Sequence, residues 1–95
     1  MPEMRFRIRW PGGQEEACYS PSLVIKDFFE PGRVYPLADF LDRSRQALTI
    51  ASDRVKARYG FPCSLALGQL DQIERASRAF AASPNATVTV LSFHD

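Results

Sequence analysis

The chain is poor in the residues that most metal sites and catalytic sites use. Its 95 residues include one histidine, His94, and two cysteines, Cys18 and Cys63. A zinc site of the common type needs about four Cys or His ligands at suitable spacing, and histidine most often serves in general acid–base catalysis. The sequence also lacks a phosphate-binding loop, a dinucleotide-binding glycine pattern and a nucleophile elbow. We therefore expect no metal, no cofactor and no catalytic residues, which favours an accessory or binding protein over an enzyme.

Long apolar runs and a surplus of one charge are missing too. No run approaches the roughly 20 apolar residues of a membrane-spanning helix, and the first residues contain no signal-peptide core. We expect a cytoplasmic protein without a membrane partner. The net charge is +1, from 12 basic and 11 acidic residues, whereas proteins that bind a phosphate backbone usually carry a basic surplus. Nucleic acid is therefore disfavoured as a partner.

The remaining composition is typical of a globular domain. The apolar fraction is 45% and the charged fraction is 24%, which are ordinary values. Ninety-five residues is the length of one small domain. We predict a single α+β domain over residues 1–95.

A β-hairpin is predicted at the start of the chain. Apolar residues at positions 4, 6, 8 and 10 alternate with arginines at 5, 7 and 9, and a period of two is typical of a half-buried strand. Pro11-Gly12-Gly13-Gln14 predicts the turn, because paired glycines tolerate the positive φ of tight turns.

A two-residue loop at Gly12-Gly13 sets the register of this hairpin. It pairs Ile8 with Ala17, Phe6 with Tyr19, and Arg9 with Glu16. This register puts apolar residues opposite each other and joins opposite charges. Cys18 then lies on the face opposite Phe6.

Two long helices follow. Apolar residues recur at steps of three and four from Leu37 to Tyr59, which predicts a helix that begins at Pro36 and is capped by Gly60. A second helix is predicted from Pro62 to about Ala82. The short link makes the two an antiparallel hairpin.

Three further segments complete the expected fold. Gly68 lies inside the second long helix. We interpret it as a residue that lets this helix come close to the backbone of the first long helix. Residues 22–29 form either a short helix or a strand, and residues 87–93 form a last strand. The order is β-β-(α)-α-α-β, with three strands and a helical hairpin on one face.

In the simplest assembly the last strand lies parallel to the first, after a right-handed crossover. One face of the sheet then stays uncovered. It would carry the three arginines, Cys18, and either Leu91 with Phe93 or Val88 with Val90. Such a mixed face suits a protein partner or a homodimer, with a small metabolite as a further ligand. The candidate partner surface is Arg5, Arg7, Arg9, Leu91 and Phe93.

Cys63 is the candidate reactive or ligand-contacting residue, with Tyr59 and Arg58. It follows Pro62 at the start of a predicted helix, where the helix dipole stabilises a thiolate. The alternative is a buried, inert cysteine, which is how free cysteines usually occur. For Cys18, on the uncovered face, the alternative is an inert strand residue.

Basic residues also gather on the first long helix, at Arg43, Arg45, Arg54, Lys56 and Arg58. They suggest a binding site for anions or for an acidic partner. Because Asp42 and Asp53 lie among them, an ordinary solvated helix face is the alternative.

Several stretches are distinctive when taken together. They are Met1-Pro2-Glu3-Met4-Arg5-Phe6 with Ile8-Arg9-Trp10-Pro11, Cys18-Tyr19-Ser20-Pro21-Ser22, Tyr35-Pro36-Leu37, Ala51-Ser52-Asp53-Arg54-Val55, and Tyr59-Gly60-Phe61-Pro62-Cys63-Ser64. In them the chain resembles, over essentially its full length, a family of small bacterial proteins called nitrogen starvation response proteins. The match is weak at residues 31–35 and after Ala82.

The resemblance implies a role in scavenging nitrogen from nitriles or cyanide during starvation. Genes of this family lie in a cluster with a nitrilase, a radical-SAM protein, an acetyltransferase and a flavoprotein. No site residue is implied, because the family has no established molecular activity.

Three hypotheses about function follow. The leading one is an accessory or binding protein of a nitrogen-starvation pathway. The first alternative is a thiol-dependent enzyme or redox sensor centred on Cys63. The second is a small nucleic-acid-binding regulator that uses the arginines of the first long helix.

Overall fold

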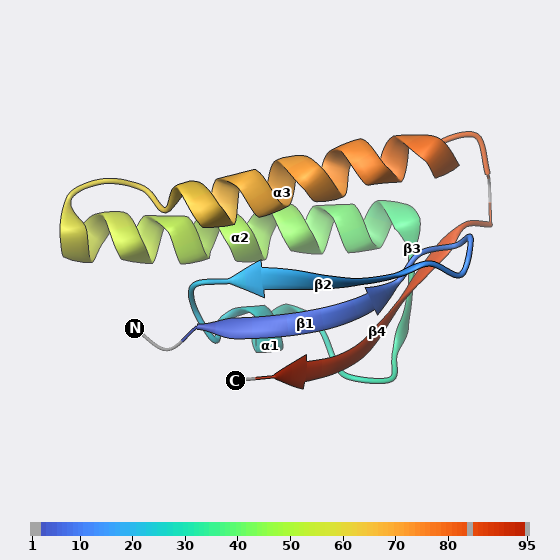
Figure 1. Ribbon diagram of the computed structural model, residues 1–95, viewed down its shortest axis with the longest axis horizontal. Helices are drawn as coiled ribbons and strands as arrows, with labels where there is room; N and C mark the ends of the chain where they lie inside the picture. Colours follow the sequence, from blue (N-terminus) through green and yellow to red (C-terminus); the bar gives the residue numbers. More distant parts are fainter. Residues whose placement is uncertain (1–2, 84, 95) are drawn as a thin grey trace.

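The computed structural model describes residues 3–83 and 85–94 and shows an α+β fold (Figure 1). Within these residues the sheet has four strands in the order β2-β1-β4-β3, and every neighbouring pair is antiparallel. The elements are β1 (Met4–Arg9), β2 (Glu15–Ser20), α1 (Ile25–Phe28), β3 (Val34–Pro36), α2 (Leu37–Tyr59), α3 (Ser64–Ser77), the 3-10 turn η1 (Arg78–Phe80) and β4 (Thr87–His94).

The α+β class is confirmed, but the expected three-stranded sheet is wrong in two respects. The sequence pattern missed β3, which has only three residues and a single buried side chain, Tyr35. In addition, β4 runs antiparallel to β1, not parallel to it. The reason is visible in Figure 1: α2 and α3 form an antiparallel hairpin, so the chain returns to the end of the sheet at which α2 began. From there β4 must run back along β3.

The β1–β2 hairpin forms, but its register differs by one residue from the expected one. The observed pairs include Phe6 with Cys18 and Arg9 with Glu15. The turn has three residues, because the amide of Gly13 donates to the carbonyl of Trp10 and the amide of Trp10 donates to the carbonyl of Gln14. Gly13 has φ of +91°, as expected where a left-handed residue closes such a loop.

Pro11 explains this difference. In a two-residue loop Pro11 would pair with Gln14 at the end of the strand, yet proline has no N–H to donate to a ladder. Within the turn its fixed φ is favourable. The shift of one residue moves Cys18 from the open face into the core.

A β-bulge interrupts the pairing of β1 and β4 between Arg7 and Ile8. Ile8 pairs with Val90 and Arg7 pairs with Ser92, so Leu91 is the extra residue. Val88 and Val90 are buried in the core. Beyond the bulge Phe93 pairs with Phe6 and packs against the same core. Phe93 therefore lies on the core side of the sheet. Its expected place in the partner surface on the uncovered face is wrong.

The core lies between one face of the sheet and the helices. Side chains of β1 alternate between buried and exposed, α3 contacts β2, and α2 contacts β3, β4 and α1. Aromatic rings fill the centre: Phe40 meets Trp10 edge-on at 5.8 Å and lies 5.3 Å from Phe29. The opposite face of the sheet carries the three arginines of β1.

The short element expected at residues 22–29 is a helix, not a strand, although it has only four residues. Pro31 and Gly32 form the turn that follows it, with Gly32 at φ of +81°. The first long helix, α2, ends where expected, whereas α3 ends at Ser77, five residues before the expected end near Ala82, and the 3-10 turn η1 follows it. Gly60 caps α2 in the left-handed conformation, and its amide donates to the carbonyl of Lys56 at 2.8 Å.

The interpretation of Gly68 is wrong. A Cβ atom added there would meet no heavy atom within 4 Å. Gly68 therefore does not permit a close approach of the two long helices. It faces an open groove instead.

Candidate functional site

The uncovered sheet face carries a row of arginines held by two glutamates. Arg7 and Arg9 each form an ion pair of 3.3 Å with Glu15. Arg5 pairs with Glu3 at 3.5 Å. Hydrogen bonds from Arg9 and then Arg7 lower the pKa of the Glu15 carboxyl. The shared glutamate orders two guanidinium groups side by side on an exposed surface.

The uncovered face also carries Leu91 and Ser92 of β4 and Tyr19 of β2. Leu91 and Ser92 lie opposite Arg7 at the bulge and are half-buried. Tyr19 pairs with Arg5. Of the five residues expected to form a partner surface, the structure therefore places Arg5, Arg7, Arg9 and Leu91 together. Sequence reasoning missed Glu15, because the assumed loop length assigned Glu16 to Arg9.

Cys63 is the N-terminal flanking residue of α3 and is half-buried. Its backbone amide donates to the hydroxyl of Ser52 on α2 at 3.2 Å. This bond fixes the end of the α2–α3 connection. The backbone of Cys63 thus has a clear structural role in the turn.

Tyr59 and Arg58 lie at the end of α2 and project into solvent. The Tyr59 side chain is 54% exposed. The Arg58 guanidinium lies 5.8 Å from the centre of its ring. This cation–π contact joins the two residues to each other, and Cys63 follows Tyr59 by four residues along the chain.

Cys18 is buried between β2 and the helices, with only 1% of its surface exposed. Burial raises the pKa of its thiol, and the nearby Glu16 carboxylate raises it further. A thiol held in this way stays protonated and is a poor nucleophile. The expected exposed position of Cys18 is wrong, whereas its interpretation as an inert residue agrees with this environment.

A groove between β2 and α3 was not expected from the sequence. It has a volume of about 540 Å³ and is lined in part by Tyr19, Leu65, Gly68 and Gln69. The Gln69 side chain accepts a hydrogen bond from the backbone amide of Tyr19 at 3.0 Å. This bond satisfies an amide at the edge of the sheet. Burial, and after it the charge of Glu3, raises the pKa of Tyr19.

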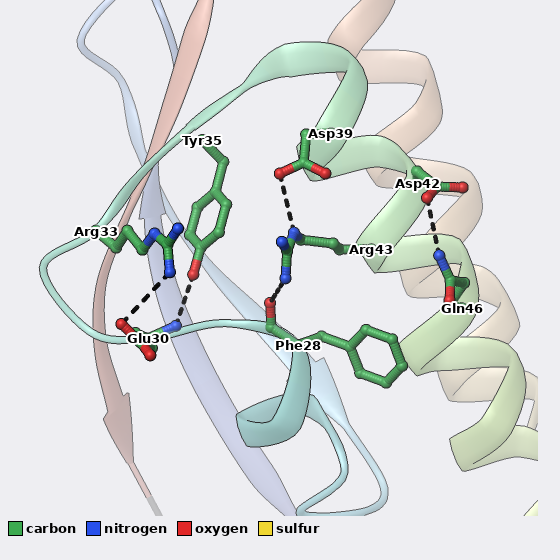
Figure 2. A network of polar contacts seen from close by, with 8 residues as sticks. All are labelled: Phe28, Glu30, Arg33, Tyr35, Asp39, Asp42, Arg43 and Gln46. Atoms are coloured by element: carbon green, nitrogen blue, oxygen red, sulfur yellow. Dashed lines mark hydrogen bonds and ion pairs between the residues drawn. The ribbon is translucent and has the colours of Figure 1, made fainter.

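Two of the five basic residues of α2, Arg43 and Arg45, make separate contacts within the fold. Arg43 donates to Asp39 at 2.9 Å and to the carbonyl of Phe28 at 2.8 Å. Arg45 pairs with Glu74 of α3. Figure 2 shows that Arg43 lies against the Tyr35 ring, between α1 and α2, where it joins two elements of the fold.

Two further findings concern the described part of the chain. Among residues 3–83 and 85–94, His, Cys, Asp and Glu side chains form no group of three or more that could hold a metal ion. Over the same residues, the helices are too short or too polar to span a membrane.

Comparison with known proteins places the chain in a family. Residues 5–93 match the family described as "Nitrogen starvation-induced protein NitG". No curated protein and no solved structure matches the chain. Because the family match covers nearly the whole sequence, the chain belongs to the NitG family of nitrogen starvation-induced proteins.

Proposed function

We propose that this protein is a non-catalytic binding protein of the nitrogen-starvation response, and that its uncovered sheet face binds an acidic surface of a protein partner in the cytoplasm. The partner belongs to a pathway that scavenges nitrogen from nitriles. Family membership supports the setting, and the arginine row on the sheet supports the mode of binding. No small-molecule cofactor enters this proposal.

The observation that carries the proposal is the order of the arginines. Arg7 and Arg9 share one carboxylate, so their guanidinium groups are held close together before a partner arrives. Arginine presents a rigid fork of donors that matches carboxylates. Donors that are already ordered before binding lose less conformational entropy when the complex forms.

The charge of this face favours a different protein over a second copy. Two copies stacked through it would bring together two faces that each carry three arginines against two glutamates. Like charges placed together at an interface are destabilising. A partner with Asp and Glu side chains on its surface has the complementary charge.

The experiment compares two double variants that remove the same charge. Arg7→Gln with Arg9→Gln alters the sheet face, and Arg75→Gln with Arg78→Gln alters exposed sites on α3 and η1. The tagged proteins are used to capture partners from nitrogen-starved cells. Any stoichiometric partner is then purified and titrated against each protein in increasing salt.

We expect the partner to bind the wild type and the Arg75→Gln, Arg78→Gln variant with the same affinity. We expect the sheet-face variant to bind at least about tenfold more weakly, with a smaller salt dependence, because two charge-assisted contacts are lost. Equal binding by both variants, or a wild-type protein that forms no complex, would contradict the proposal.

A further inference from the structure

The end of the helical hairpin projects beyond the core. The buried residues of α2 end at Ser52, and those of α3 begin at Ala66. Between these positions every residue except Val55 and Cys63 is exposed. In Figure 1 this end extends past the sheet, and it forms one extremity of a molecule that measures 40 × 23 × 17 Å. We call residues 53–65 the hairpin tip.

Large apolar side chains gather at the tip. Tyr59, Phe61 and Leu65 are 54%, 67% and 66% exposed. Single exposed apolar residues are common on proteins, but a group of them at one place usually marks an interaction surface. The fold itself does not need them, because they lie outside the core cluster.

The charges of the tip are mainly basic. Residues 53–65 contain Arg54, Lys56 and Arg58 against the single acidic residue Asp53. Arg54 also donates a hydrogen bond to the Ser22 hydroxyl at 3.1 Å, so Lys56 and Arg58 are the basic residues most available to a ligand. The first turn of α3 has no acidic residue. Aromatic and leucine side chains with basic residues beside them are the composition of protein segments that lie in the interface of an anionic bilayer.

We propose that the hairpin tip is a reversible anchor for an anionic membrane surface, with Phe61 and Leu65 inserted at the headgroup level. Such surface contact does not require a membrane-spanning helix. A second copy is a poor occupant, because two basic tips repel each other. A protein partner at the tip is the other outcome that the test below distinguishes.

The chemistry of the proposed contact has two parts. The basic residues are attracted to the negative surface potential, and this attraction weakens as salt rises. The apolar side chains leave water when they insert, and this part is insensitive to charge. The two parts predict weak, salt-dependent binding that needs both an anionic lipid and an apolar tip.

The test is flotation of the whole protein with lipid vesicles. Vesicles of phosphatidylcholine alone are compared with vesicles that also contain phosphatidylserine, at low and at physiological salt. The tip variant is Phe61→Ser with Leu65→Ser. The control is Val34→Ser, because Val34 is 53% exposed on β3, at the other end of the molecule. Circular dichroism confirms that each variant is folded.

The wild type and V34S should float with anionic vesicles at low salt and not with phosphatidylcholine alone. The tip variant should bind at least about tenfold more weakly, since removing one inserted Phe or Leu side chain already implies such a change. Failure of the wild type to float at low salt would overturn the proposal, as would equal flotation of the tip variant.

The tip proposal and the sheet-face proposal fail separately. A partner complex that is lost in the tip variant and kept in the Arg7, Arg9 variant, together with no flotation, would assign the tip to a protein partner. Flotation that survives in the Arg7, Arg9 variant would support the tip whatever binds the sheet face.

Discussion

The Arg43 guanidinium lies 5.2 Å from the centre of the Tyr35 ring and donates a hydrogen bond to the carbonyl of Phe28 at 2.8 Å. Arg33 lies on the same ring at 5.4 Å. The Tyr35 hydroxyl in turn accepts a bond from the amide of Glu30 at 2.8 Å. Together these contacts join the loop after α1, the edge strand β3 and helix α2.

Removing the Tyr35 hydroxyl should destabilise the protein modestly. Tyr35 is 2% exposed, so Tyr35→Phe leaves the Glu30 amide without its partner and keeps the ring. We expect the free energy of unfolding to fall by about 1 kcal/mol, measured by urea denaturation. No change would mean that water replaces the hydroxyl as acceptor.

Replacing Arg43 should destabilise more than replacing an arginine in a simple surface pair. Arg43→Ala removes an ion pair, a bond to a backbone carbonyl and a cation–π contact. Arg75→Ala removes only the pair with Asp71 on an exposed helix face. Thermal unfolding should show the larger drop in melting temperature for Arg43→Ala. Equal drops would mean that the α1–α2 link contributes little.

Two glycines should respond to alanine in opposite directions. Gly68 lies inside α3 with open space around it, so Gly68→Ala should stabilise the protein by about 1 kcal/mol through helix propensity. Gly60 has φ of +88° at the end of α2. Gly60→Ala should therefore destabilise by about 1 kcal/mol.

Denaturant unfolding of both glycine variants measures the signs. A destabilised Gly68→Ala would show that Gly68 has a role in packing or dynamics that the open groove does not reveal.

Stability should fall at alkaline pH because of Cys18. Burial raises the pKa of this thiol in the folded protein, so only the unfolded chain releases the proton near the ordinary pKa of about 9. Below that pH the contribution is fully present. Above it the free energy of unfolding should decrease by about 1.4 kcal/mol per pH unit.

Cys18→Ala is the control for this slope. Unfolding of the variant between pH 8.5 and 10 should lack the additional decrease, whereas deprotonation of other groups affects both proteins. Parallel curves for the two proteins would exclude Cys18 as the source.

Thiol reactivity separates the binding hypothesis from a thiol-dependent enzyme or redox sensor. In the folded protein iodoacetamide should modify Cys63, which is half-buried, before Cys18, which is buried. A non-catalytic protein should show a rate at Cys63 no faster than that of a free cysteine. A much faster rate, measured by mass spectrometry, would favour the thiol-dependent alternative.

The local elements and the family were accessible from the sequence because short-range patterns encode them. Alternation in β1 followed from its arginines and apolar residues, and the three-and-four spacing of α2 ended at a glycine that has the left-handed conformation. The three arginines expected on the open face lie there. Leu91 lies beside them, but the pattern had left its place open between two arrangements of the last strand. The residues quoted for the family resemblance lie almost entirely within the matched range.

The tertiary structure decided the features that depend on one-residue differences and on chain direction. Pro11 entered the turn and shifted β2 by one residue, which moved Cys18 into the core and Glu15 to the arginines. A bulge at Leu91 turned Phe93 inward. The helical hairpin returned the chain to the end of the sheet at which it left, which made β4 antiparallel. A period of two identifies a strand but does not reveal its register, and only packing against the helices selects which face is buried.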